Sequence, residues 1–216
     1  MQVNPKSNCN LCPRLVDFRK ANQKKFTDFH NGPVESFGEL DSRLLIVGLA
    51  PGLKGANKTG RPFTGDYAGD VLYSTLIKFG FAKGLYSQSK DDGLKLLDCR
   101  ITNAVRCVPP ENKPIGSEVK SCRSFLNSEI KSMVNLQAIL ALGVTAHNSL
   151  LACLKLSLKD YAFKHSVIHK VSNDNRSFKL IDSYHCSRYN INTKRLSVEM
   201  FEDVFESITK LLSSTE

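Results

Sequence analysis

Four of the seven cysteines have the spacing of metal ligands. Cys9 and Cys12 form a C-x2-C pair directly before a predicted helix, and such a turn lets two thiolates bind one metal centre. Cys107 and Cys122 lie across a proline-rich loop and could complete a cage of four thiolates. The spacing fits zinc, an iron–sulfur cluster or free, partly buried thiols. Because a second pair matches the first, we expect a metal centre.

A glycine-rich stretch over residues 48–70, GLAPGLKGANKTGRPFTGDYAGD, is the second candidate site. Its glycines let the backbone approach a ligand closely. Its positive charges, which suit phosphates, come from Lys54, Lys58 and Arg61. Phe63 offers a flat apolar face, and Asp66 is the acid that we expect within the site. Taken alone, Phe63 could equally be a core residue and Asp66 a turn cap.

The charge pattern favours a polyanionic partner. The chain has 30 Lys and Arg against 21 Asp and Glu, a net charge of +9. The basic residues concentrate in 155–195, which we expect to be the polyanion footprint, whereas the acidic last helix should be solvated. The longest apolar runs, 44–50 and 138–142, are too short to span a bilayer, and the N-terminus lacks a signal-peptide core. We therefore expect a cytoplasmic protein with reduced thiols and no membrane partner.

Short apolar strands alternate with helices along the chain, which predicts how these residues are positioned. The expected strands are 43–49, 101–105, 138–142 and 178–183, and the expected helices are 14–29, 69–79, 117–134, 143–156 and 197–212. Ser117 is the expected N-cap of its helix. This order predicts a single α/β domain over 1–216, a three-layer α/β/α sandwich with a mostly parallel four-stranded sheet. The polar loops 48–70, 103–116 and 184–195 should meet at the carboxyl edge of the sheet, where ligands bind.

Four ordered motifs give the chain a resemblance to a known family. They are CNLCPRL at the start, GLAPG with GANKTGRPFTGD, TNAVRCVPPENKP, and HCSRYNINTKRLSVEM. Together they resemble the iron–sulfur uracil-DNA glycosylases, closest to the family 5 (type B) branch, over residues 9 to about 205. The resemblance implies an α/β/α fold and a 4Fe–4S cluster on Cys9, Cys12, Cys107 and Cys122. It also implies excision of uracil, hypoxanthine and xanthine from DNA, which leaves an abasic site.

Two positions bear on which branch of this superfamily the chain resembles. Family 4 enzymes have a glutamate where this chain has Leu49, so the apolar residue resembles family 5. The last motif usually begins His-Pro-Ser, whereas here it reads His185-Cys186-Ser187, and we expect a looser loop.

The resemblance also implies roles for single residues. Phe63 would stack on the flipped base, Asn103 would read its edge, and backbone groups of Leu49 and Ala50 would complete the pocket. His185 would stabilise the departing base, and Asp66 would orient water or stabilise the sugar cation. DNA would be held by Lys54, Lys58, Arg61, Ser187, Arg188, Tyr189, Lys194 and Arg195, with Tyr189 as a possible wedge. No lysine nucleophile is implied, so we expect a monofunctional enzyme without strand cleavage. We also expect a monomer.

Two alternatives remain at this point. One is a family 4-like enzyme that is restricted to uracil. The other is a non-catalytic nucleic-acid-binding module with a structural metal site, which would need the basic stretch and the cysteines but not Asp66, Asn103 or His185.

Overall fold

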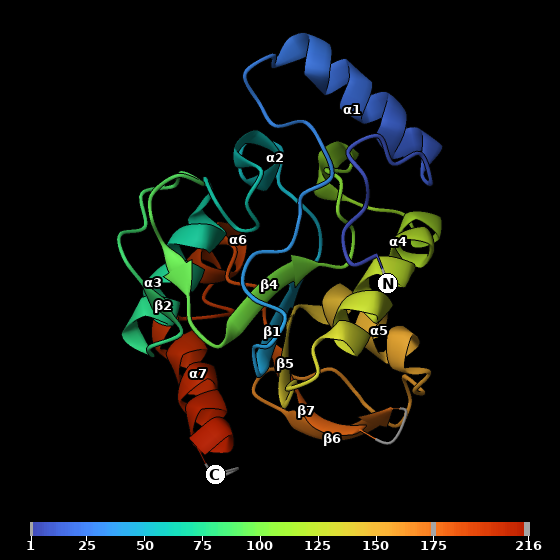
Figure 1. Cartoon of the computed structure of the whole chain (residues 1–216). Coiled ribbons are helices and arrows are strands. Elements are labelled where there is room, and N and C mark those ends of the chain that lie inside the picture. The colour runs from blue at the N-terminus through green and yellow to red at the C-terminus, as the bar shows by residue number, and fades with distance from the viewer. Residues whose placement is uncertain (1, 174–175, 214–216) are drawn as a thin grey trace.

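A five-stranded sheet with helices on both faces forms the core of the computed structural model, which describes residues 2–173 and 176–213 (Figure 1). Its strands, in spatial order, are β4 (Cys99–Asn103), β1 (Leu44–Gly48), β5 (Ala138–Leu142), β7 (Arg176–Ser183) and β6 (Ile168–Asn173). The first four are parallel, and β6 pairs with β7 in the antiparallel direction. The predicted α/β/α class is confirmed, with five strands where the sequence predicted four.

The alternation of side chains along each strand produces the two outer layers. Leu44 and Ile46 of β1 pack in one apolar cluster with α3 (Tyr67–Lys78) and α7 (Val198–Ser213). Leu45 and Val47 point the other way, toward α4 (Gly116–Ser132) and α5 (Val144–Leu154). Figure 1 shows these helix pairs on opposite sides of the sheet. A strand buried on both faces must be apolar throughout, which explains the run LLIV.

The remaining elements are short, apart from α1 (Pro13–Lys25), which lies beyond the carboxyl edge of the sheet near the start of α4 (Figure 1). They are α2 (Ala56–Thr59), α6 (Arg188–Asn192), the small strands β2 (Ala82–Lys83) and β3 (Lys95–Leu96), and a 3-10 turn at Pro110–Asn112. The helices α2 and α6 lie inside loops that the sequence left without structure.

Two details of the helices differ from expectation. The N-cap of α4 is Ile115 and not Ser117, and the Glu118 carboxylate accepts a hydrogen bond of 2.9 Å from the Ile115 amide. The last helix, α7, is not merely a solvated acidic face. It buries a stripe of apolar residues against the sheet, namely Phe201, Val204, Phe205, Ile208 and Leu212.

The basic stretch 155–195 does not form one continuous footprint. Much of it folds into the β6–β7 hairpin, which includes the fifth strand that the sequence analysis missed. Arg176 begins β7 at the amino end of the sheet, where its guanidinium donates to the carbonyls of Ile130 and Met133 at 3.3 and 2.6 Å. The segment after β7 reaches the carboxyl edge, and so does the segment before β6, where the Ser166 amide donates to the Asp182 carbonyl at 2.8 Å and the Tyr184 amide donates to His165 Nδ1 at 3.2 Å.

The parallel register brings the loop-bearing strand ends together. Gly48, the last residue of β1, pairs with Asn103, the last residue of β4, and Leu142 pairs with Ser183. The loops that follow therefore start side by side. Within residues 2–173 and 176–213, none of the helices is long and apolar enough to cross a membrane.

Candidate active site and cysteine cage

An open cleft with about 1360 Å³ of empty space lies at the carboxyl edge of the sheet. Asp66, Asn103 and His185 all line it, although they come from the start of α3, the end of β4 and the segment after β7. Leu49, Ala50 and Phe63 line it as well. The expectation that three loops converge on one site therefore matches the geometry.

The two carboxylate oxygens of Asp66 have different surroundings. Oδ1 accepts a hydrogen bond of 3.0 Å from the Gly69 amide, so Asp66 is the N-cap of α3. Oδ2 lies against Gly52 and Gly55, and a methyl group added to Gly55 would approach it to 2.4 Å. Asp66 is thus both the cap that its sequence context suggested and an acid that lines the cleft.

Asn103 and Phe63 approach each other over Gly48. A side chain at Gly48 would meet Asn103 Oδ1 and Phe63 Cζ, each at 2.5 Å, so only glycine fits there. Asn103 is buried, and its carboxamide has no hydrogen-bond partner within the described ranges 2–173 and 176–213. The backbone φ of Phe63 is 52°, a strained value for a bulky residue. Strain of this kind is common where a side chain must be aimed at a ligand.

His185 lies beside Phe63, with the ring centroids 5.8 Å apart and the planes inclined by 25°. Burial lowers the pKa of His185, and the charge of Asp66 only partly opposes that effect. The imidazole is therefore neutral at neutral pH and can donate one hydrogen bond while it remains uncharged.

The segment after His185 is anchored despite the missing proline. Cys186 is fully buried, and its thiol donates to the carbonyl of Ala68 at 3.4 Å. Ser187 caps α6 by accepting a hydrogen bond from the Asn190 amide at 3.3 Å. The Asn190 carboxamide in turn donates to the His185 carbonyl at 2.8 Å. The loop that the missing proline was expected to loosen is thus held at three points.

The predicted DNA-binding residues are distributed unevenly. Lys54, Ser187 and Arg188 line the cleft, and the Arg188 guanidinium lies 5.2 Å from the centre of the Tyr67 ring. Four others lie outside the cleft lining, namely Lys58, Tyr189, Lys194 and Arg195. Of these, Tyr189 on α6 is 72% exposed, Lys58 lies over the Phe29 ring and Arg195 over the Tyr184 ring.

Arg61 is where the prediction of a phosphate contact has to be corrected. Its side chain is buried and forms a bidentate ion pair with Asp92, at 2.7 and 2.8 Å. The guanidinium also lies near the rings of Phe37, Tyr73 and Tyr86. Arg61 therefore ties the glycine-rich loop to the segment that holds Asp92, and its charge is not available to DNA.

Sequence reasoning overlooked two residues that line the cleft, Tyr67 and Asn112. Tyr67 directly follows Asp66, so its place at the first turn of a helix could have identified it. Asn112 belongs to the proline-rich loop and has a φ of 56°, which asparagine tolerates better than most residues. The sequence predicted that the loop over 103–116 would reach this edge of the sheet, but it did not indicate which of its residues would line the cleft.

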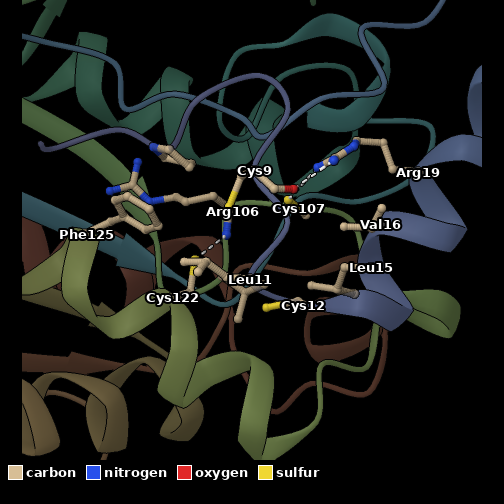
Figure 2. Close-up of a pocket in the computed structure, with 12 residues that line it drawn as sticks. Cys9, Leu11, Cys12, Leu15, Val16, Arg19, Arg106, Cys107, Cys122 and Phe125 are labelled. Carbon is tan, nitrogen blue, oxygen red and sulfur yellow. Dashed lines mark hydrogen bonds between the residues drawn. The ribbon is translucent and has the colours of Figure 1, made fainter.

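The four cysteines with metal-ligand spacing surround a separate, small and mostly apolar pocket (Figure 2). Cys9 and Cys12 lie before and at the start of α1, Cys107 follows β4, and Cys122 lies on α4. The other lining is mostly apolar and includes Leu11, Leu15, Val16, Val105 and Phe125. The predicted set of four thiols is therefore gathered in one place.

Burial raises the pKa of Cys107 to about 12 and that of Cys122 to about 11. Such thiols would be protonated on their own, so a bound cation is needed to make them thiolates. Two donors already point at these sulfurs. The Arg106 amide donates to Cys122 Sγ at 3.4 Å, and Arg19 Nη1 lies 3.8 Å from Cys107 Sγ.

The sulfurs are not already arranged around a single zinc ion. A tetrahedral zinc ion with Zn–S bonds of about 2.3 Å holds its sulfurs about 3.8 Å apart. In the described part of the chain, no three of the cysteine sulfurs lie within 4.8 Å of one another. A larger centre of several irons fits a wider, apolar cage of four thiols.

The other three cysteines, Cys99, Cys153 and Cys186, are buried. Burial raises the pKa of each, to about 12 for Cys153. Inert, protonated thiols in the interior behave as small apolar residues.

A second polar group joins α5, β6 and β7. His147 Nδ1 is 2.7 Å from Asp182 Oδ1 and its Nε2 is 2.8 Å from the Tyr161 carbonyl, while His169 Nε2 is 3.3 Å from Asp182 Oδ2. Both nitrogens of His147 thus face acceptors, which requires a protonated ring. Burial alone would lower the pKa of His147, but the hydrogen bond and charge of Asp182 outweigh it and raise the pKa. These contacts describe a buried ion pair.

Comparison with known proteins agrees with this geometry. The profile of the uracil DNA glycosylase superfamily matches residues 35–209. A type-5 uracil-DNA glycosylase of Pyrobaculum aerophilum is 37% identical over 206 residues, which cover 94% of this chain and 88% of that protein. A type-5 enzyme of Thermus thermophilus is 38% identical over 208 residues, with coverages of 94% and 93%. A type-4 uracil-DNA glycosylase of Thermotoga maritima is 37% identical over 110 residues, 50% of this chain and 49% of that protein.

Proposed function

Since the chain belongs to the uracil DNA glycosylase superfamily, we propose that it hydrolyses the N-glycosidic bond of uracil in DNA within the cleft and leaves an abasic site. The observation that carries this proposal is that Asp66, Asn103 and His185 line one cleft around the Phe63 ring. A module that only bound nucleic acid would not need a carboxylate, a carboxamide and an imidazole at the same edge.

Base recognition is assigned to Phe63, Asn103 and the backbone after β1. Phe63 gives the flipped base a face on which to stack, and the carboxamide of Asn103 can donate to one edge atom of uracil and accept from another. The carbonyl of Leu49 already accepts from the Val105 amide at 2.9 Å. The contribution of Leu49 and Ala50 is therefore assigned to their amide groups and to the apolar side chain of Leu49.

His185 is assigned to the leaving base. Cleavage of the bond between C1′ and the base leaves negative charge on the base oxygens. A neutral, half-buried imidazole can donate a hydrogen bond to such an oxygen as its negative charge develops.

Asp66 is assigned to the sugar and the water. Its Oδ1 is used by the helix cap, so Oδ2 carries the chemistry, either by orienting the attacking water or by stabilising the oxocarbenium-like sugar. Because no lysine amine is needed as a nucleophile, the reaction ends with the free base and an abasic site.

The iron–sulfur cofactor is assigned to Cys9, Cys12, Cys107 and Cys122. A 4Fe–4S cluster bound there would cross-link the N-terminal segment, the loop after β4 and α4. That loop also carries Asn112, which lines the cleft. The cage residues would thus fix one wall of the substrate site.

The substrate range is assigned more widely than uracil. An open cleft with apolar Leu49 at its floor has room for larger deaminated bases, such as hypoxanthine and xanthine. DNA would be gripped by Lys54 and Arg188 at the cleft, with Lys58, Lys194 and Arg195 around it and Tyr189 as a candidate wedge. We also assign the active form as a monomer.

The test is excision from oligonucleotides that each contain one lesion, with protein whose iron content has been measured. We expect release of uracil, hypoxanthine and xanthine and an alkali-sensitive abasic site without strand cleavage. Release of uracil alone would favour the uracil-restricted alternative. Tight DNA binding without an abasic product would contradict the assignment of Asp66, Asn103 and His185.

A further inference from the structure

Arg19 is a buried cation without an acidic partner. It lies on α1 with 7% of its surface exposed, and within residues 2–173 and 176–213 no carboxylate pairs with it. Its two contacts are Cys107 Sγ, 3.8 Å from Nη1, and the carbonyl of Cys9, 2.8 Å from Nη2. Figure 2 shows the side chain reaching from α1 to the two cysteines.

A buried guanidinium is strongly disfavoured unless negative charge lies close to it. Another buried arginine that lines the cage shows the usual solution, because Arg106 pairs with the Glu129 carboxylate at 2.5 Å. For Arg19, the nearby groups that can become negative are the thiols of the cage. The negative charge of four thiolates exceeds the positive charge of an iron–sulfur core. A cage that holds the cluster would therefore supply the counter-charge that Arg19 lacks.

We propose that Arg19 donates a charge-assisted hydrogen bond to the Cys107 sulfur of the bound cluster and thereby raises the reduction potential of the cluster. This inference rests on the cluster assigned above. Adding one electron makes the cluster more negative, so a fixed cation at one ligand sulfur stabilises the reduced form more than the oxidised form.

The same side chain joins the two halves of the cage. One arm contacts the carbonyl of Cys9 in the N-terminal turn, and the other contacts Cys107 after β4. Arg19 therefore also opposes the separation of the N-terminal turn from the rest of the cage, and its loss should speed the release of iron to a chelator.

The experiment compares purified wild-type protein with R19Q, R19K and K20Q. The Lys20 side chain is exposed on the same helix, so K20Q removes the same charge one residue away without touching the cage. Iron and sulfide content are measured first, and the one-electron midpoint potential is then measured at an electrode. Loss of iron to a chelator is followed by absorbance.

For R19Q we expect the ratio of reduced to oxidised cluster at a fixed potential to fall about tenfold, which equals 59 mV for one electron. Iron loss should be at least several-fold faster, R19K should be intermediate, and K20Q should match wild type. If R19Q proves too unstable to load, R19K must still show a lower potential than K20Q.

Equal potentials for R19Q, R19K and K20Q, with full iron in each, would overturn the inference. Wild-type protein with stoichiometric zinc and no iron would overturn the cluster and this inference together. Uracil excision by the same samples is scored separately, so failure of the proposed reaction is distinguishable from failure of the role of Arg19.

Discussion

Asp66 caps α3 with one oxygen and, in the proposed reaction, acts with the other, and a single substitution can separate the two. In D66N the amide oxygen can still accept from Gly69 and cap α3, but the negative charge at the cleft is gone. We expect a loss of about 10²- to 10⁴-fold in the rate of uracil excision under single-turnover conditions.

The thermal midpoint of D66N should stay close to that of wild type, because the cap remains. D66A is the matched comparison and should lose about 1 kcal/mol of unfolding free energy in addition to activity. A D66N enzyme with near wild-type excision would remove Asp66 from the chemistry.

Gly48 permits the contact between the two residues assigned to the base. G48A would push its methyl group against Asn103 and Phe63, both of which would have to move. We expect a fall of at least tenfold in excision and a loss of about 1–3 kcal/mol of unfolding free energy. Gly116 is the control position, because a methyl group there meets no atom within 4 Å. If G48A excised uracil as fast as G116A, the close approach of Asn103 and Phe63 to Gly48 would not matter for the reaction.

At the scale of elements, we predict that DNA is bound by the loops around α2 and by α6 rather than by the β6–β7 hairpin. Lys54 and Arg188 line the cleft. By contrast, Lys164 lies just before β6 and Lys170 lies on β6, and both side chains are exposed. Each phosphate contact contributes about 0.9 to the slope of log affinity against log salt for duplex DNA. The double variant K54Q/R188Q should therefore lower that slope by about 1.8.

The comparison for this prediction is K164Q/K170Q, which removes equal charge from the region that the sequence suggested. Its salt slope should stay within error of wild type when binding is measured by fluorescence anisotropy at several salt concentrations. A larger effect from K164Q/K170Q than from K54Q/R188Q would restore the basic stretch as the footprint.

The elements differ in how far the sequence reveals them. The buried parallel strands are visible because both of their faces are apolar, as in 44–48 and 138–142. By contrast, β6 is an edge strand with His169 and Lys170 among its residues, so it has no apolar run and resembles a charged loop. A strand of this kind is defined by its pairing with β7, which is a contact that single-sequence patterns do not contain.

The same limit applies to the site. Asp66, Asn103 and His185 could be identified because each belongs to one of the four motifs and lies within or beside a predicted element. The burial of Arg61 could not, because its partner Asp92 lies in a segment without a sequence signal. Whether a cation in a glycine-rich loop faces a phosphate or a carboxylate depends on such distant contacts.

At the scale of the whole molecule, the buried pair of His147 and Asp182 couples stability to pH. The pKa of His147 is raised by folding, so the folded state holds the proton more tightly than the unfolded state. Its stabilising contribution is complete below the unfolded pKa of about 6.5 and is lost as pH rises through the raised folded value. H147Q should lose about 3 kcal/mol of unfolding free energy at pH 6.

The measurement is urea unfolding of both proteins between pH 6 and 9, with the difference taken at each pH. Because the wild type loses the contribution of His147 at high pH, the difference should shrink as pH rises. In this difference, the contributions of groups that titrate alike in both proteins cancel. His165, whose pKa is lowered by burial, is one such group. A difference that grows with pH would show that His147 is neutral in the folded protein.

The cysteine cage joins a pair near the start of the sequence to a pair near its middle, and this has a consequence during synthesis. Cys9 and Cys12 leave the ribosome long before Cys107 and Cys122. At about 5–20 residues per second, the delay is on the order of ten seconds. During that time the first pair of thiols is exposed without its partners. Loading of the proposed cluster must therefore await Cys107 and Cys122, or the nascent chain must be shielded from stray metal ions.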